Sequence, residues 1–228
     1  MFSMRLLYPK MMEFTQEEIR QEYDRAAPWY DFHISMVEGL TGIARMRRTL
    51  LRKANGKILE IAVGTGRNFP YYPRNCTITA IDPSPQMLEL AYKRAEKLHL
   101  HPELRVMDAQ ALDFPDRSFD TVVSSLGLCT IPEPVRALRE VTRVCRPEGK
   151  ALFLEHGRSS VQWIARLQDR FSDAWYRKHM GCRWNREPVQ FIEKAGWKVL
   201  SHRRSFFGIL HIIEARLDQR LYGRSDSA

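Results

Sequence analysis

The sequence predicts an α/β fold with an open, mostly parallel sheet and helices on both faces. Short apolar and β-branched runs alternate with amphipathic stretches of helical period, and strands separated by helices form parallel βαβ units. The stretch ILEIAVGTGRN, residues 58–68, also passes from an apolar run directly into glycines. Such a turn is typical of a parallel strand whose end approaches a ligand. The chain has 228 residues, which is enough for one large domain with its own core.

Two helices are expected before the first strand. Thr15 and Glu18 have the spacing of a capping box, which predicts a helix start. Pro28 predicts a break, and a second helix is expected over roughly 34–53. Residues 1–53 would then form a helical lid or leader. Its first segment, MFSMRLLYPKMM, is apolar and basic, and we interpret it as a docked leader or, alternatively, as a weak membrane-surface anchor.

The sheet is predicted from residue 57 onward. Five strands are expected in KILEIA, TITAID, LRVMDA, FDTVVSSL and KALFLEH, with helices over 83–98 and 133–146 and two late strands within 197–217. The late pair would complete a seven-stranded sheet as an antiparallel edge. We expect residues 54–220 to form this domain, with a mostly helical, aromatic insertion around 158–188, and residues 221–228 to be a flexible tail.

Composition limits the class of protein. No stretch approaches 18 apolar residues, so no transmembrane helix is expected. The four cysteines are scattered without a C-x-x-C spacing, which is neither a zinc pattern nor a disulfide framework. We therefore predict a cytoplasmic protein without a metal, in which each cysteine is a small core residue.

The net charge of +9 is uneven along the chain. From Arg158 to the C-terminus there are 14 Lys/Arg against 7 Asp/Glu. A basic C-terminal part suits an anionic partner such as a phospholipid surface, a nucleic acid or an acidic substrate. A solvated, arginine-rich face is the alternative interpretation.

Three acids mark the ends of three successive predicted strands. Glu60 precedes the glycine turn in the pattern E-x-A-x-G-x-G, where a dinucleotide fold has G-x-G-x-x-G. A carboxylate there would repel a pyrophosphate and suits a cationic amino-acid end. Asp82 could accept from both hydroxyls of a ribose, and Asp108 could accept from an exocyclic amine. The ordered set predicts S-adenosylmethionine as the ligand; the alternative is an α/β fold with ordinary strand-end acids and no cofactor.

At this point the sequence resembles the class I S-adenosylmethionine-dependent methyltransferases, in the type 11 group that includes ubiquinone and menaquinone C-methyltransferases. The resemblance covers about residues 14–217 and rests on YDRAAPWYD, ILEIAVGTGRN, AIDPSPQML, MDAQALDFPDRSFDTVVSSLGLCTI and LREVTRVCRPEGKALFLEH. It implies a Rossmann-like fold, S-adenosyl-L-methionine as cofactor and S-adenosyl-L-homocysteine as product. The family usually has glycine where this chain has Ala62; we expect that the backbone there need not be left-handed and that binding survives.

The resemblance also implies which residues hold the cofactor. By motif, the residues that would line the methionine side are Glu60, Ala62, Gly64, Gly66 and Asn68. Asp82, beside Pro83, would bind the ribose, and Met87 would pack against the adenine. Asp108 and Ala109 would contact the adenine amino group, and Leu126 would lie under the sulfonium.

Residues 155–197 are similar to a subgroup with bacterial phospholipid methyltransferases and animal thiol S-methyltransferases. Methyl transfer mainly needs alignment of the nucleophile and exclusion of water, with a base only where the acceptor must lose a proton. His156 is the candidate base, with a histidine bound to a loop carbonyl as the alternative. Tyr23 and Tyr30 are candidates for reaching the methyl group, since that segment folds over the cofactor in the family; plain packing is the alternative.

Two further groups could shape an acceptor pocket. Cys182 with Arg183 could do so, although a buried structural thiol is the simpler interpretation. The aromatic residues of the C-terminal part are expected to belong to the core, or to form an apolar lid over the acceptor. They are Trp163, Phe171, Trp175, Tyr176 and Trp184.

The predicted function is methyl transfer to a small or lipid-like acceptor: a phospholipid amine, a thiol or a quinol. The basic C-terminal part and apolar N-terminus favour peripheral contact with an anionic membrane. A nucleic-acid methyltransferase is disfavoured, since LGLCTI stands where amino-methylating enzymes carry an Asn/Asp-Pro-Pro-aromatic tetrapeptide. A non-catalytic cofactor-binding protein is the other alternative. The sequence makes no prediction of oligomeric state.

Overall fold

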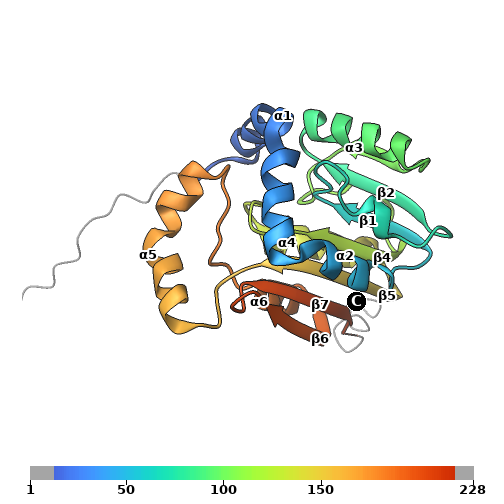
Figure 1. The fold of residues 1–228 in the computed structure, drawn as a ribbon. Helices are drawn as coiled ribbons and strands as arrows, with labels where there is room; N and C mark the ends of the chain where they lie inside the picture. The colour runs from blue at the N-terminus through green and yellow to red at the C-terminus, as the bar shows by residue number, and fades with distance from the viewer. Residues whose placement is uncertain (1–12, 219–228) are drawn as a thin grey trace, which may run out of the picture.

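The computed structural model describes residues 13–218 and has one seven-stranded sheet between two layers of helices (Figure 1). The elements are α1 (Gln16–Thr41), α2 (Ile43–Leu51), β1 (Lys57–Ile61), the 3₁₀ helix η1 (Phe69–Tyr71), β2 (Thr77–Asp82), α3 (Pro85–Lys97), β3 (Glu103–Val106), β4 (Phe119–Ser125), α4 (Pro134–Val144), β5 (Cys145–His156), α5 (Gln162–Lys178), α6 (Pro188–Lys194), β6 (Trp197–Ser205) and β7 (Leu210–Leu217). The predicted leader segment 1–12 and tail 221–228 lie outside the described residues.

The strand order is β3-β2-β1-β4-β5-β7-β6. The first five strands of the order are parallel, and β7 pairs antiparallel with both β5 and β6. The predicted α/β class, the seven strands and the antiparallel edge pair are therefore confirmed. The order reverses between β1 and β4, and ligands of open α/β sheets bind beyond the carboxyl ends of the strands at such a switch point.

The core consists of two apolar layers, one on each face of the sheet. Along β5, Phe153 packs into the layer beneath α4 and α6, while its neighbours Leu152 and Leu154 pack into the layer beneath α2 and α3. Alternate strand residues point to opposite faces, so a central strand covered on both faces is apolar throughout. Each of these three side chains is fully buried and stabilises the fold by about 1.5–3 kcal/mol.

The helix start predicted at Thr15 is confirmed, and the break predicted at Pro28 is wrong. Thr15 Oγ1 accepts from the Glu18 N–H at 3.2 Å while the Glu18 carboxylate accepts from the Thr15 N–H at 2.7 Å. Helix α1 continues through Pro28, which is exposed, and ends at Gly42 with a φ of 73°. An interior proline costs a helix about 3 kcal/mol. We attribute its tolerance here to the side-chain contacts of α1 with the glycine turn, with Ser84 and with α3, which are described below.

Within residues 13–218, no helix combines the length and the apolar character needed to cross a bilayer.

Candidate active site

A cavity lies at the carboxyl ends of the strands, with the first half of α1 as one wall. The empty space among its lining residues is about 610 Å³ and includes open solvent. The lining residues are Gln16, Ile19, Arg20, Tyr23, Tyr30, Ala62, Gly64, Asp82, Pro83, Met107, Asp108, Ala109, Leu126, Gly127, Thr130 and Ile131. Their one cation, Arg20, is paired with acids of its own helix, so the wall facing a ligand is acidic.

Asp82 ends β2 and ties two turns together. Its Oδ2 accepts from the Gly64 N–H at 2.8 Å, and its Oδ1 accepts from the Ser84 N–H at 2.9 Å. Burial raises the pKa of Asp82 to about 6, although both N–H groups favour the carboxylate. The carboxylate that faces the cavity therefore also fixes the glycine turn.

The two glycines of the turn have different surroundings. Gly64 lines the cavity with a φ of 54°, and a Cβ there would meet no atom within 4 Å. Gly66 has a φ of 74°, does not line the cavity, and a Cβ there would lie 2.5 Å from Cε2 of Phe69. Gly64 is thus the position at which backbone is open to a ligand, whereas Gly66 makes room for a core ring.

The expectation that Ala62 avoids a left-handed backbone is wrong. Ala62 has a φ of 51°, a conformation that costs a residue with a Cβ about 1–2 kcal/mol. Its methyl group lies against Gly127, where an added Cβ would come within 2.7 Å of it. Alanine fits at 62 because the facing residue has no side chain.

Glu60 and Asn68 lie behind the turn and are not among the cavity-lining residues. The Glu60 carboxylate accepts from Asn68 Nδ2 at 2.8 Å and from the Tyr72 hydroxyl at 2.7 Å. Asn68 Oδ1 in turn accepts from Arg47 at 2.5 Å. Burial raises the pKa of Glu60 to about 7. In this structure Glu60 supports the turn from inside.

The raised pKa of Glu60 predicts a pH effect on the free energy of unfolding. An acid whose pKa is higher in the folded state stabilises the fold fully below its unfolded pKa, near 4.5, and loses that contribution as pH rises through about 7. Glu60→Gln keeps a neutral side chain at every pH. Between pH values of about 5.5 and 8, the wild type should therefore lose on the order of 2 kcal/mol more stability than this variant.

The measurement is urea unfolding of both proteins at the two pH values, without cofactor. Glu148→Gln, at an exposed acid, is the matched control and should follow the wild type. Parallel pH profiles of wild type and Glu60→Gln would contradict the assignment.

Helix α1 is clamped onto the glycine turn by side chains that the sequence interpretation did not single out. Asp31 accepts from Thr65 Oγ1 at 2.7 Å and from Arg67 at 3.0 Å, and it also pairs with Arg94 of α3. Two helical turns earlier, Asp24 accepts from Ser84 Oγ at 2.5 Å. Both acids stand in the stretch YDRAAPWYD, where attention to charge beside the tyrosines would have found them.

The network continues from the turn into the core. Glu38 of α1 pairs with Arg67 at 2.6 Å and with Arg47 at 2.8 Å. Since Arg47 also donates to Asn68, a continuous chain of polar contacts joins the acid inside β1 to the outer helix.

Only some of the residues predicted to contact the adenine and ribose line the cavity. Asp108 and Ala109 line the cavity after β3, and the Asp108 carboxylate accepts from the Gln110 N–H at 2.8 Å. Met87 is fully buried and does not line the cavity, whereas Met107 does. Pro83 lines it beside Asp82.

Leu126 lines the cavity just after β4 in a left-handed conformation, with a φ of 58°. Its N–H donates to the Leu154 carbonyl at 2.7 Å. The loop is also held by Glu155, whose carboxylate accepts from Ser124 Oγ at 2.6 Å and from the Leu128 N–H at 3.2 Å. Strained backbone that its surroundings hold in place often marks a functional site.

Tyr23 and Tyr30 both line the cavity, with ring centroids 6.0 Å apart. Burial raises the pKa of each phenol above its ordinary value. Both are therefore neutral near pH 7, so they can donate hydrogen bonds into the cavity but are poor proton acceptors.

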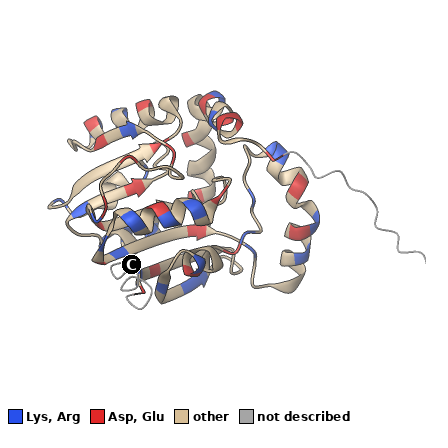
Figure 2. Ribbon diagram, turned by 180° about the vertical axis from the view of Figure 1, so that it is seen from behind, with Lys and Arg blue, Asp and Glu red and all other residues tan. Residues whose placement is uncertain are grey.

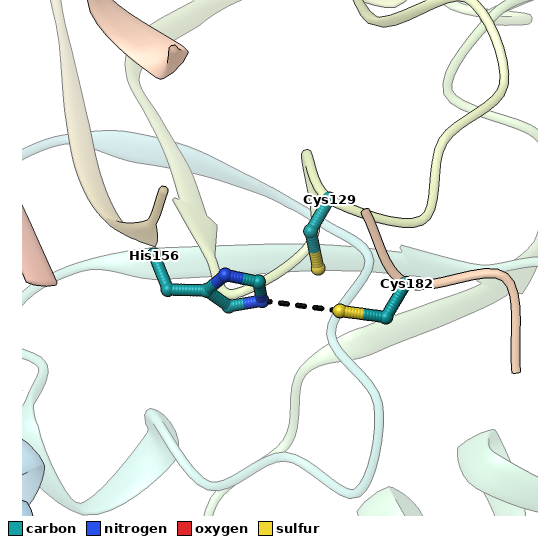
Figure 3. Close-up of side chains that lie close together, drawn as sticks. All are labelled: Cys129, His156 and Cys182. Carbon is teal, nitrogen blue, oxygen red and sulfur yellow. Dashed lines mark hydrogen bonds between the residues drawn. The ribbon is translucent and has the colours of Figure 1, made fainter. Parts of the chain in front are cut away.

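His156, at the end of β5, lies with two cysteines and does not line the cavity (Figure 3). Its Nε2 is 3.4 Å from Cys182 Sγ, and Cys129 completes a group whose donor atoms lie within 4.8 Å of one another. The Cys129 thiol and the imidazole lower the pKa of Cys182. The pKa of His156 is raised by Cys182 and Glu155 against the effect of burial. The prediction that each cysteine is a small core residue holds for Cys129 and Cys145, which are buried, whereas Cys76 and Cys182 are only half-buried.

The C-terminal aromatic residues divide into an inner and an outer set. Trp175 stacks between His179, at 3.6 Å, and Trp184, at 4.2 Å, and Tyr176 is buried. Trp163 and Phe171 are 64% and 50% exposed on the outside of α5, so they belong neither to the core nor to the cavity.

Arg183, the predicted companion of Cys182, points along the surface instead. It pairs with Glu13 at 2.9 Å and lies over the Tyr176 ring at 4.3 Å.

The chain is similar to known methyltransferases. A family model described as a methyltransferase domain matches residues 59–153. Phosphatidylethanolamine N-methyltransferase of Cereibacter sphaeroides is 39% identical over 144 residues, which are 61% of this chain and 68% of that protein. Human thiol S-methyltransferase TMT1B is 35% identical over 177 residues, 75% of this chain and 68% of that one.

Two other relatives add length and fold. Against the mitochondrial methyltransferase OMS1 of Saccharomyces cerevisiae, identity is 28% over 85% of this chain, which spans only 45% of the yeast protein. The crystal structure of an S-adenosylmethionine-dependent methyltransferase from Thermotoga maritima superposes with a TM-score of 0.64 at 20% identity, over 90% of this chain and 100% of that one.

Proposed function

Because the chain belongs to the class I S-adenosylmethionine-dependent methyltransferases, we propose that it methylates a small thiol. The observation that carries this proposal is the cluster of Cys129, His156 and Cys182, which adjoins the cavity because the Cys129 thiol donates to the carbonyl of the cavity-lining Leu126 at 3.4 Å. A thiol acceptor needs a nearby group that takes its proton. Human TMT1B, named a thiol S-methyltransferase, is similar over three quarters of the chain.

The cavity fits the cofactor of the family. Asp82 and Asp108 offer carboxylates to ribose hydroxyls and to an exocyclic amine, and Gly64 leaves the backbone open where a Cβ would project into empty space. When bound, S-adenosylmethionine supplies an electrophilic methyl group on a sulfonium. We assign the cofactor contacts to these three residues, with Ala62, Pro83, Ala109 and Leu126 as apolar neighbours, and we place Glu60, Gly66, Asn68 and Met87 in support behind them.

The remaining roles follow from position. Tyr23 and Tyr30 close the cavity from α1 and, as neutral phenols, orient the acceptor and exclude water. In the metal-free protein, His156 is the candidate proton acceptor, since its imidazole lies 3.4 Å from Cys182 Sγ in the cluster and imidazoles exchange protons in the physiological pH range. The region 158–188, which contains α5, would border the acceptor.

The test is release of S-adenosylhomocysteine with a panel of alkyl thiols, phosphatidylethanolamine vesicles, a quinol and bulk RNA. Turnover with thiols supports the proposal. Turnover with amine, quinol or RNA alone overturns it, and so does silence across the panel when calorimetry still shows cofactor binding. His156→Ala should lower thiol turnover at least about tenfold, whereas the exposed His101→Ala should not.

A second candidate, a lipid amine at an anionic membrane, is favoured by the outer face of α5. Trp163, Leu167 and Phe171 recur every four residues and are all exposed. Arg166 and Arg170 stand beside them on the same side of the helix, and Figure 2 shows α5 and its charged residues at one side of the molecule. An apolar stripe flanked by arginines is typical of helices that lie in the interface of an anionic bilayer.

Co-sedimentation with phosphatidylglycerol-containing and pure phosphatidylcholine vesicles tests this surface. We expect binding to the anionic vesicles that weakens with salt, and Trp163→Ser with Phe171→Ser should weaken it at least about tenfold. Tyr92→Ser, at a comparably exposed aromatic of α3, is the control. Equal binding to both vesicle types, or no effect of the double substitution, would contradict a membrane role for α5.

A further inference from the structure

Three soft donor atoms converge from distant parts of the chain. Cys129 lies in the loop after β4, His156 ends β5, and Cys182 follows α5. Their sulfur and nitrogen atoms point toward a common centre (Figure 3) and lie within 4.8 Å of one another, with Cys182 Sγ and His156 Nε2 at 3.4 Å. Two sulfurs and an imidazole are the donors that zinc prefers.

The spacing fits one tetrahedral ion. Zinc–sulfur bonds of about 2.3 Å and zinc–nitrogen bonds of about 2.0–2.1 Å place neighbouring donors roughly 3.5–3.8 Å apart. Cys182 Sγ and His156 Nε2, 3.4 Å apart, are already near that spacing, and the other donor distances, all within 4.8 Å, would shorten through side-chain adjustment on binding.

Hydrogen bonds hold the three donor segments together independently of any metal. The Arg183 N–H donates to the Cys129 carbonyl at 3.0 Å, which joins the two cysteine segments directly. On the other side of Cys129, the Leu128 N–H donates to the carboxylate of Glu155, the residue before His156. Arg186 donates to the Ile131 carbonyl at 2.7 Å and fixes the same loop. All three ligands are thus preorganised by direct contacts between their segments.

We propose that Cys129, His156 and Cys182 bind one Zn²⁺ ion and leave its fourth coordination position open. Three protein ligands with one exchangeable position are typical of catalytic zinc sites, whereas structural sites use four. Binding requires both sulfurs as thiolates and a neutral imidazole, so metal affinity falls at acid pH.

An open position next to the loop 126–131, which holds Cys129 and borders the cavity, would suit a soft acceptor. A thiol bound to zinc is deprotonated by the metal, so the ion would take over the role given to His156 in the metal-free protein. This last step rests on the proposed thiol acceptor, whereas metal binding itself does not.

Metal content is measured on the full chain, purified from zinc-supplemented medium and dialysed without chelator. We expect elemental mass spectrometry to find about one zinc ion per chain. Replacing zinc with Co²⁺ should give a near-ultraviolet thiolate-to-cobalt charge-transfer band. Cys182→Ser and Cys129→Ser should each lower zinc content at least roughly tenfold, and Cys76→Ser, a half-buried cysteine outside the cluster, should retain it.

A second measurement keeps the test decisive where a variant fails to fold. In the wild type, bound zinc should protect the half-buried Cys182 from alkylation and chelation should restore its reactivity, whereas the half-buried Cys76 should react in both states. A reduced chain without zinc, or a Cys129–Cys182 disulfide in its place, overturns the proposal. Because these readouts need neither cofactor nor acceptor, they fail separately from the methylation assay.

Discussion

Asp82→Ala is expected to weaken S-adenosylmethionine binding, so that the Kd is at least about 100-fold higher than that of the wild type. The substitution removes the acceptor of the Gly64 and Ser84 N–H groups as well as the carboxylate assigned to the ribose. A charged hydrogen bond is worth about 1.5–3 kcal/mol, and several are lost together. Isothermal calorimetry gives the Kd directly.

Thermal unfolding separates lost binding from lost folding. Wild type saturated at about 100 times the Kd should gain roughly 2.7 kcal/mol of stability, a gain that Asp82→Ala and the isosteric Asp82→Asn should lack. Asp113→Ala, at an exposed acid between β3 and β4, should keep it. Unchanged affinity in a folded Asp82→Asn protein would refute the assignment.

The second large effect is expected from the two glycines of the turn, on stability at Gly66 and on cofactor binding at Gly64. Gly66→Ala places a Cβ 2.5 Å from the buried Phe69 ring on a left-handed backbone, which should destabilise the fold by about 2–4 kcal/mol. Gly64→Ala meets no protein atom, so its cost is about 1 kcal/mol of backbone strain. Its methyl group instead enters the space of the ligand and should weaken cofactor binding.

Urea unfolding and calorimetry on both variants check this contrast. Gly196→Ala is the control, since it too has a positive φ and no atom within 4 Å, but lies outside the cavity lining. It should match Gly64→Ala in stability and the wild type in affinity. Equal stability losses in Gly64→Ala and Gly66→Ala would show that the Phe69 contact is unimportant.

The fold was largely predictable because its signals are local. Alternating apolar strands, Pro85 at a helix start and the Thr15–Glu18 capping box each act over a few residues, and all correspond to observed elements. Pro28 shows the limit of local rules. Its effect on α1 is outweighed by contacts of Asp24 and Asp31 with residues of the turn and α3, and sequence spacing does not reveal such contacts.

The candidate site was predictable where a strand end determines it and not where side chains from several segments meet. Asp82, Asp108 and Leu126 reach the cavity because each ends a parallel strand or follows one within two residues. Glu60 is the last residue but one of β1, yet Asn68 and Tyr72 hold it on the inner side of the turn. The left-handed Ala62 depends on the missing side chain of Gly127, which follows three strands later in the sequence.

The clamp between α1 and the glycine turn also affects how fast a ligand can leave the cavity. Both cavity-lining tyrosines belong to the same helix as Asp24 and Asp31. Moving α1 away from the cavity therefore breaks the contact of Asp24 with Ser84 and the contacts of Asp31 with Thr65, Arg67 and Arg94. Ion pairs of this kind weaken as salt is added. We therefore expect added salt to shorten the residence time of a ligand in the cavity.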